Sequence, residues 1–221
     1  MQLAHTIYQP PGEGPHPTIL TLHGRGANAF DLLGLAPCLS AGRFLMICPQ
    51  APLETPIGPE AVGYAWYSAS KGGVPDIDGM LESREALQAF LDDCLARYPI
   101  DPTRLAVLGF SQGGVMAYSL ALAQPERFAA LMVLSSWLPQ ELLAEIAISD
   151  AVQSLPTLVQ HGRQDPMIEV ERGRKSVERL GALKLPLTFR EYAMGHEIRS
   201  DGLMDLSAWL EKNLGATSGR P

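Results

Sequence analysis

A serine between two glycines is the strongest chemical signal in this 221-residue chain. The run Gly109-Phe110-Ser111-Gln112-Gly113 matches the pattern G-x-S-x-G. The pattern places a serine on a sharp turn between a strand and a helix, where glycines permit a strained backbone and close neighbours. Such a turn lifts the hydroxyl out of the sheet and exposes it to solvent, so we predict that Ser111 is a nucleophile.

A serine hydroxyl attacks efficiently only when a base removes its proton, and histidine most often supplies that base. Of the five histidines, His196 lies in a polar loop near the end of the chain, from which an imidazole can reach Ser111. We therefore predict His196 as the general base, whereas His23 and His161 end strands before glycines and are expected to be structural. Because the base must be neutral, activity should rise with pH through roughly 6–7.

An acid should orient the histidine, and in hydrolases built on parallel sheets it lies between the serine and the histidine in chain order. Asp165 follows a predicted strand and fits this place. Asp150 lies in a polar connection before that strand, and Asp201 suits a helix cap better. The alternative for Asp165 is a plain turn residue before proline.

Backbone amides are expected to hold the negative charge of the tetrahedral intermediate. The Gln112 N–H lies at a helix start, and the turn Gly24-Arg25-Gly26 offers a second donor, most plausibly the Arg25 N–H. The alternative for this segment is a simple glycine turn. Since the backbone performs this task, the Arg25 side chain is free, and we expect it to contact an anionic substrate group.

A substrate pocket should be mostly apolar. Six side chains near predicted strand ends are candidates to line it, and each is equally consistent with core packing: Trp66, Phe110, Trp137, Leu138, Met167 and Ile168.

Strand and helix patterns alternate along the chain, which predicts an α/β fold with a mostly parallel sheet covered by helices on both faces. The predicted strands are 18–23, 44–48, 104–109, 128–134, 157–161 and 187–192, and the predicted helices are 78–98, 112–123, 169–180 and 202–214. His5 and His16 fall in the polar segment before the first predicted strand. Residues 50–78 are predicted to form a functional surface loop, Asp201 to cap the last helix, and residues 215–221 to fray.

Composition narrows the class of protein. Residues 1–221 are expected to form one domain, since 46% of them are hydrophobic and the length suits one large core. With 24 acidic and 17 basic residues the net charge is −7, which disfavours a nucleic-acid partner. Cys38, Cys48 and Cys94 form no pair motif and are expected to be reduced thiols in or near the core. The sequence shows no signal-peptide or membrane-span pattern, so we expect a cytoplasmic monomer or homodimer.

Taken together, the motifs resemble the phospholipase/carboxylesterase family of α/β-hydrolases, which includes acyl-protein thioesterases. The strings that carry the resemblance span most of the chain: LHGRG (22–26), ICPQAP (47–52), GFSQGG (109–114), LSSWLP (134–139), HGRQDP (161–166) and GH (195–196). The resemblance implies an α/β-hydrolase fold without a large lid domain, so we expect an open, shallow site and short to medium acyl chains. It also implies hydrolysis of carboxylic esters or thioesters with neither a metal nor an organic cofactor.

Two departures favour a general carboxylesterase over an acyl-protein thioesterase. The thioesterase branch tends to carry an apolar residue in place of Arg25 and an acidic one in place of Ala27, and it differs around Trp66 and Tyr67. Thioesterase or lysophospholipase activity with the same three residues remains the alternative. A dienelactone-hydrolase-like enzyme would need a cysteine in place of Ser111, and a catalytically silent binding protein would usually lack one of the three.

Overall fold

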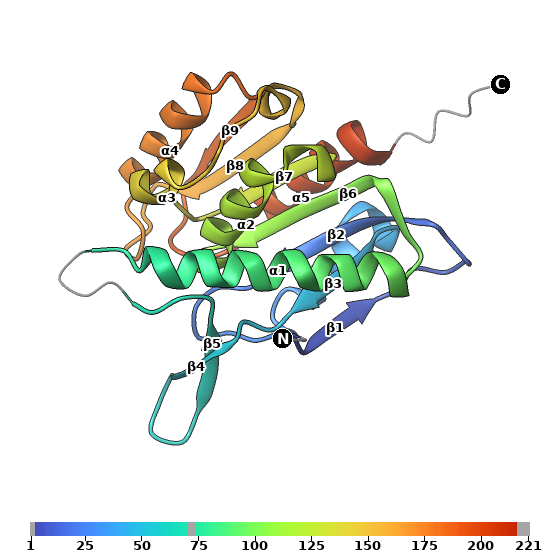
Figure 1. Ribbon diagram of the computed structural model, residues 1–221, viewed down its shortest axis with the longest axis horizontal. Helices are drawn as coiled ribbons and strands as arrows, with labels where there is room; N and C mark the ends of the chain where they lie inside the picture. Colours follow the sequence, from blue (N-terminus) through green and yellow to red (C-terminus); the bar gives the residue numbers. More distant parts are fainter. Residues whose placement is uncertain (1–2, 70–73, 216–221) are drawn as a thin grey trace.

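The computed structural model describes residues 3–69 and 74–215, and a seven-stranded sheet runs through its centre (Figure 1). The order across the sheet is β1 (His5–Tyr8), β3 (Leu45–Pro49), β2 (His16–Leu22), β6 (Ile100–Phe110), β7 (Ala130–Leu134), β8 (Thr157–Gly162) and β9 (Leu187–Tyr192). Only β1 is antiparallel to its neighbour. The predicted mostly parallel sheet is therefore confirmed.

The strand order reverses between β2 and β6. The chain passes from β2 to β3 on one side and later returns to place β6 on the other side of β2. Leu22 pairs with Gly109, so the two strands end side by side. Ligands of open α/β sheets bind outside the carboxyl ends of the strands at such a reversal, so this edge is where a site is expected.

Helices cover both faces of the sheet. One face carries α1 (Ile77–Arg97), α2 (Gln112–Ala123), α3 (Gln140–Ala144) and α4 (Val170–Ala182), and the other carries α5 (Ser200–Leu210) (Figure 1). Shorter turns complete the fold: η1 (Leu33–Cys38), η2 (Ser40–Gly42), η3 (Pro125–Arg127), η4 (Asp150–Ser154) and the π turn η5 (Glu211–Gly215). Each face has its own apolar cluster, one under α1 to α4 and one under η1 and α5.

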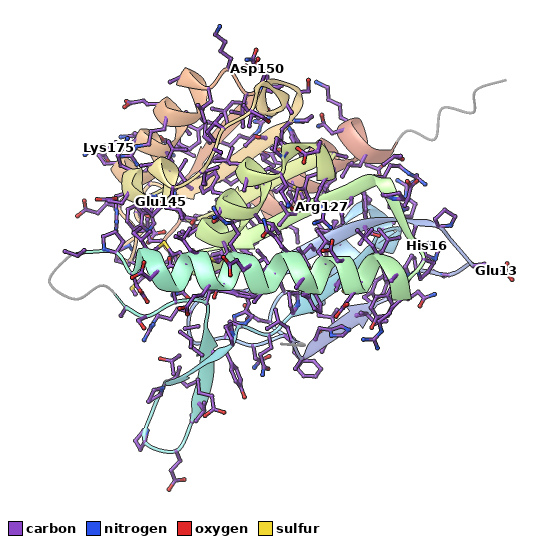
Figure 2. The ribbon with its side chains drawn as sticks, viewed as in Figure 1. Glu13, His16, Arg127, Glu145, Asp150 and Lys175 are labelled. Atoms are coloured by element: carbon purple, nitrogen blue, oxygen red, sulfur yellow. The ribbon has the colours of Figure 1, made fainter. Side chains whose placement is uncertain are left out.

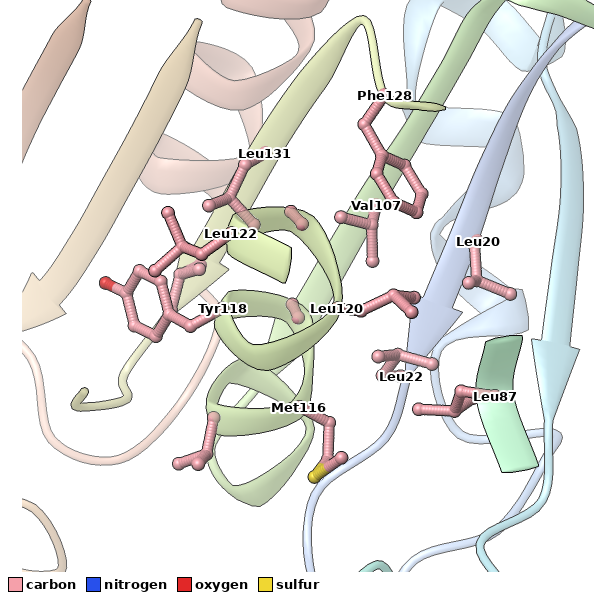
Figure 3. Close-up of a cluster of buried hydrophobic side chains, with 14 of the residues drawn as sticks. Leu20, Leu22, Leu87, Val107, Met116, Tyr118, Leu120, Leu122, Phe128 and Leu131 are labelled. Atoms are coloured by element: carbon pink, nitrogen blue, oxygen red, sulfur yellow. The ribbon is translucent and has the colours of Figure 1, made fainter. Parts of the chain in front are cut away.

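Helix α2 is the most deeply buried helix, because all of its residues except Ala123 are buried. A helix that is apolar all round belongs in the interior rather than at the surface. Met116 and Leu120 point toward Leu20 and Leu22 of β2, while Tyr118 lies on the opposite side of the helix (Figure 3). This packing fixes the start of α2 against the carboxyl end of β2.

The predicted surface loop 50–78 is wrong in part, since it contains the hairpin β4 (Leu53–Pro56) and β5 (Val62–Ala65), and its last two residues begin α1. Residues 70–73 of the predicted loop lie outside the described residues. The hairpin projects from the body of the molecule (Figure 1) and is anchored on the turn after β2. There the Gly26 N–H donates to the Tyr64 carbonyl at 2.8 Å, and the Tyr64 N–H donates to the Ala27 carbonyl at 2.9 Å. Each strand has only four residues and lies in a Gly- and Pro-rich stretch, so the sequence shows no run of β-forming residues long enough to predict it.

Other expectations need correction at the ends of the chain. His5 and His16 lie in β1 and β2 rather than in a polar segment, and His16 is buried. Asp201 does not cap α5, because the cap position is Arg199 and Asp201 lies within the helix. Of the expected frayed tail, Gly215 ends the π turn, and 216–221 lie outside the described residues. Cys38 is exposed, unlike Cys48 and Cys94.

Charged side chains occupy the outer surface of the molecule. Asp150 and Lys175 lie at its outer edge in Figure 2, and both are exposed. Among the helices in residues 3–69 and 74–215, none combines the length and apolar character needed to cross a membrane.

Candidate active site

Ser111 lies on the turn between β6 and α2 with a strained backbone. Its φ is 54°, in the left-handed region that non-glycine residues rarely adopt. Two hydrogen bonds hold this conformation: the Ser111 N–H donates to the Leu134 carbonyl at 3.0 Å, and the Ser136 hydroxyl donates to the Ser111 carbonyl at 2.6 Å. Strain of this kind persists where the surroundings enforce it and is typical of functional sites.

The glycines around Ser111 are required by close backbone approach. A Cβ at Gly109 would overlap the carbonyl of Gly113, and a Cβ at Gly113 would overlap the carbonyl of Leu22 at the end of β2. The turn therefore brings the start of α2 against the end of β2. This contact is the physical reason for glycines at these two places in the G-x-S-x-G pattern.

Asp165 and His196 form a close pair of ionisable side chains at this edge. The Asp165 Oδ2 lies 2.7 Å from the His196 Nδ1, and the other oxygen accepts from the N–H groups of Met167 at 2.8 Å and Ile168 at 2.9 Å. The Asp165 side chain is fully buried, whereas that of His196 is 17% exposed. The imidazole also packs on the Phe110 ring, with the ring centres 4.9 Å apart.

His161 lies beneath the Asp165 loop and is fully buried. Its Nε2 is 2.7 Å from the Ile168 carbonyl and 3.6 Å from the Asp165 Oδ2. The contact to Ile168 ties down the far end of the short segment whose amides bind Asp165. This placement fits the structural role predicted for His161.

His23 supports the turn that follows β2. Its Nδ1 donates to the Gly24 carbonyl at 2.7 Å, and its Nε2 accepts from the Ala51 N–H at 3.1 Å. A ring with one donor and one acceptor nitrogen is neutral. Burial lowers the pKa of His23, against weaker opposing effects of the Gly24 carbonyl and Asp31, so the turn is built around an uncharged imidazole.

The Gln112 side chain joins the start of α2 to the segment after β5. Its Oε1 accepts from the Trp66 N–H at 2.8 Å, and its Nε2 donates to the Tyr67 carbonyl at 2.7 Å. The Trp66 indole N–H in turn donates to the His23 carbonyl at 2.9 Å. Gln112 is the first residue of α2, where amide N–H groups have no partner within the helix.

An open cavity of about 600 Å³ lies over these groups. Its lining is Gly24, Arg25, Gly26, Ala27, Asp31, Tyr67, Ser68, Ala69, Phe110, Ser111, Gln112, Trp137, Met167, Ile168 and His196. The structure thus brings Ser111 and His196 together with the predicted oxyanion-hole segments around Arg25 and Gln112.

Four of the six predicted substrate-binding side chains line the cavity: Phe110, Trp137, Met167 and Ile168. The other two do not, because Trp66 is 1% exposed and Leu138 is fully buried, and both pack in the core under α1 to α4. Tyr67 lines the cavity although no sequence pattern marks it as a site residue. The sequence does not show which of the adjacent Trp66 and Tyr67 is buried in the core and which lines the cavity.

One arginine lines the cavity, and a second lies behind it against the cavity-lining Trp137. Arg25 lines the cavity and donates one hydrogen bond to the Thr55 hydroxyl at 2.9 Å. The Arg172 guanidinium lies over the Trp137 ring, 3.4 Å from its centre. Burial raises the pKa of the Tyr67 hydroxyl, the charges of Arg172 and Arg25 lower it, and the charge of Asp76 raises it.

Within the described part of the chain, no group of three or more His, Cys, Asp or Glu side chains is arranged to hold a metal ion. The site's polar groups are instead the Asp165–His196 pair, Ser111, and backbone amides beside an apolar wall. Such a set is suited to acyl transfer, in which a hydroxyl attacks a carbonyl carbon.

Comparison with known proteins places the chain in one family. The family model described as phospholipase/carboxylesterase matches residues 3–214. The chain is 27% identical over 216 residues to an acyl-protein thioesterase 1 of Gibberella zeae, covering 89% of this chain and 90% of that protein. It is 28% identical over 211 residues to a protein of Oryza sativa subsp. japonica named a probable carboxylesterase, covering 90% of this chain and 78% of that protein.

Among solved structures, esterase PE8 superposes with a TM-score of 0.82 at 27% identity, covering 97% of this chain and all of that one. The α/β-hydrolase fold expected from the sequence motifs is thereby confirmed. The family match extends over nearly the whole chain and includes every strand of the central sheet. The chain therefore belongs to the phospholipase/carboxylesterase family, whose members are hydrolases that act on ester bonds.

Proposed function

We propose that this protein is a serine carboxylesterase that hydrolyses short- to medium-chain carboxylic esters with Ser111, His196 and Asp165. The observation that carries the proposal is the 2.7 Å contact between Asp165 Oδ2 and His196 Nδ1, at the rim of a cavity that Ser111 also lines. Asp165 holds the proton on Nδ1, which leaves the second ring nitrogen free to accept the serine proton.

In the acylation step, the Ser111 Oγ bonds to the ester carbonyl carbon while its proton passes to His196. The resulting oxyanion accepts hydrogen bonds from the N–H groups of Arg25 and Gln112. Collapse of the intermediate breaks the bond to the alcohol oxygen, which takes the proton from His196. The acyl group is then attached to Ser111.

Deacylation reverses the same roles. A water molecule gives one proton to His196, and its oxygen bonds to the acyl carbon. Collapse of the second intermediate releases the carboxylic acid, and the Ser111 oxygen regains its proton from His196. The water thus supplies the hydroxyl of the acid product and restores the serine.

The open cavity supports the choice of short to medium chains. Its apolar side chains, Phe110, Trp137 and Ile168, cover a small area next to Ser111, and Met167 at its rim is 72% exposed. A long acyl chain would leave much of its surface in water. The second candidate function is that of a thioesterase or lysophospholipase. One relative is named an acyl-protein thioesterase, and the same three residues could catalyse hydrolysis of a thioester.

A panel of p-nitrophenyl esters and acyl thioesters of graded chain length tests the proposal. We expect kcat/KM to peak at short to medium esters, and Ser111→Ala to lose at least about 1,000-fold in rate. Activity that rises steadily to long acyl chains, or thioester hydrolysis that far exceeds ester hydrolysis, would favour the second candidate. Full activity in Ser111→Ala would overturn the assignment of the nucleophile.

A further inference from the structure

The cavity has two walls of different chemistry. Tyr67 and Trp137 belong to the core cluster under α1 to α4, whereas Phe110 packs on the opposite cluster under η1 and α5. His196 packs on Phe110, so the catalytic imidazole lies on the η1 and α5 side. Because the proposed mechanism has His196 protonate the leaving alcohol, the alcohol occupies that side. The acyl chain then extends along the wall of Tyr67 and Trp137.

This acyl wall is cationic. Arg25 lines the cavity, and within the described residues it uses one of its five N–H donors, on the Thr55 hydroxyl. Arg172 stacks on Trp137 and so holds its planar fork beside the same wall. Among the described residues, no carboxylate oxygen lies within 4.0 Å of either guanidinium.

The acidic groups nearby do not cancel these charges. Glu169 and Glu141 act on Arg172, and Asp76 acts on Tyr67, but none of them forms an ion pair with either arginine in the described chain. Asp31 lines the cavity too, yet its neighbours Leu32 and Leu33 pack on the η1 and α5 cluster with Phe110. Within the described residues Asp31 forms no ion pair with either arginine, so its carboxylate does not occupy their N–H donors.

We infer that the preferred substrates carry a carboxylate at the far end of the acyl chain, bound by Arg25 and Arg172 across the Tyr67 hydroxyl. This inference rests on the proposed esterase function and names its substrate class. Guanidinium groups bind carboxylates through charged, geometrically defined hydrogen bonds. The chain as a whole carries a net charge of −7. Two arginines that have no carboxylate partner among the described residues are therefore unusual in this chain, and one of them lines the cavity.

The test compares two esters of the same length, 4-nitrophenyl hemiadipate and its neutral methyl ester. We expect kcat/KM for the anionic ester to exceed that for the neutral ester by roughly tenfold, mainly through KM. Arg172→Gln and Arg25→Gln should each reduce this ratio several-fold. Lys175→Gln is the matched control, because Lys175 is an exposed cation of the same helix as Arg172 at the outer edge of the molecule (Figure 2).

Salt gives a readout that needs no variant. Raising the ionic strength to roughly 0.5 M should lower the ratio in the native protein, because it screens exposed charges. A ratio of one or below in the native protein, or one unchanged by both arginine substitutions, would overturn the inference while leaving the esterase function intact. Hydrolysis of neither ester would overturn the proposed function and the inference together.

Discussion

Asp165 uses its two carboxylate oxygens for different tasks. One oxygen accepts from the amides of Met167 and Ile168, which fixes the side chain in place, and the other meets the His196 Nδ1 at 2.7 Å. A carboxylate can accept at both oxygens, whereas an amide side chain has one acceptor and one donor end. The orientation of His196 therefore depends on a carboxylate at position 165, which an amide of the same shape does not replace.

Asp165→Asn tests this division of tasks. The amide oxygen can keep the two backbone N–H bonds, so its NH₂ group faces His196 and favours the tautomer that cannot accept the serine proton. We expect kcat to fall by roughly 100- to 10,000-fold with an unchanged circular dichroism spectrum. Asp150→Asn is the control, since Asp150 is an exposed carboxylate in η4, and an equal loss in both variants would contradict the assignment.

At the residue scale, a sequence pattern predicts a site residue only from its near neighbours or from its place in the chain order. Ser111 is found by its own glycines, and Asp165 and His196 by chain order and loop position; their catalytic roles stay predictions. The Gln112 side chain bridges to Trp66 and Tyr67, more than forty positions away. No local pattern indicates such a pairing, which is why Tyr67 was missed at the cavity and Trp66 was selected instead.

At the element scale, the β4–β5 hairpin positions the turn that carries Arg25. The hairpin contacts this turn through the bridge between Ala27 and Tyr64, and Ile57 lies against Gly26. The contact is tight, because a Cβ added at Gly63 would overlap the Gly26 carbonyl. The long parallel-sheet elements were predictable from apolar runs and helical spacing, but two four-residue strands in a Gly- and Pro-rich stretch were not.

Gly63→Ala should separate the hairpin from the turn after β2. The added methyl group has to displace the Gly26 backbone, which we expect to cost about 1–3 kcal/mol of unfolding free energy and to lower kcat/KM. Gly58→Ala is the matched control in the same hairpin, because the nearest atom to its added Cβ is 3.9 Å away. Thermal unfolding and ester hydrolysis of both variants check this. Equal behaviour of the two would mean that the hairpin contact does not position the turn.

At the scale of the whole molecule, the site depends on a buried neutral histidine. His23 joins the turn after β2 to Ala51. If the ring took up a second proton, its Nε2 could no longer accept the hydrogen bond from the Ala51 N–H. Burial lowers its pKa in the folded protein. Below the ordinary histidine value of about 6.5, the unfolded chain therefore binds a proton that the folded chain does not. The contribution of His23 to the unfolding free energy is therefore fully present above that pH and is lost as the pH falls below it.

We expect the unfolding free energy of the native protein to decrease between pH 7 and pH 5, by up to about 1.4 kcal/mol per pH unit from His23. His23→Asn removes the titrating group, so its stability should be lower at pH 8 but should fall less steeply in acid. Urea unfolding at several pH values in this range measures both slopes. Parallel curves for the two proteins would show that His23 does not contribute to acid sensitivity.

The central claim is that Ser111 is a nucleophile activated by His196. Labelling with a fluorophosphonate, followed by peptide mass spectrometry, tests it most directly, because the reagent forms a bond only with an activated serine. We predict one label per chain on the peptide that contains Ser111, lost in Ser111→Ala and strongly slowed in His196→Ala. Absence of labelling in the folded native protein, or labelling at another residue that persists in Ser111→Ala, would contradict it.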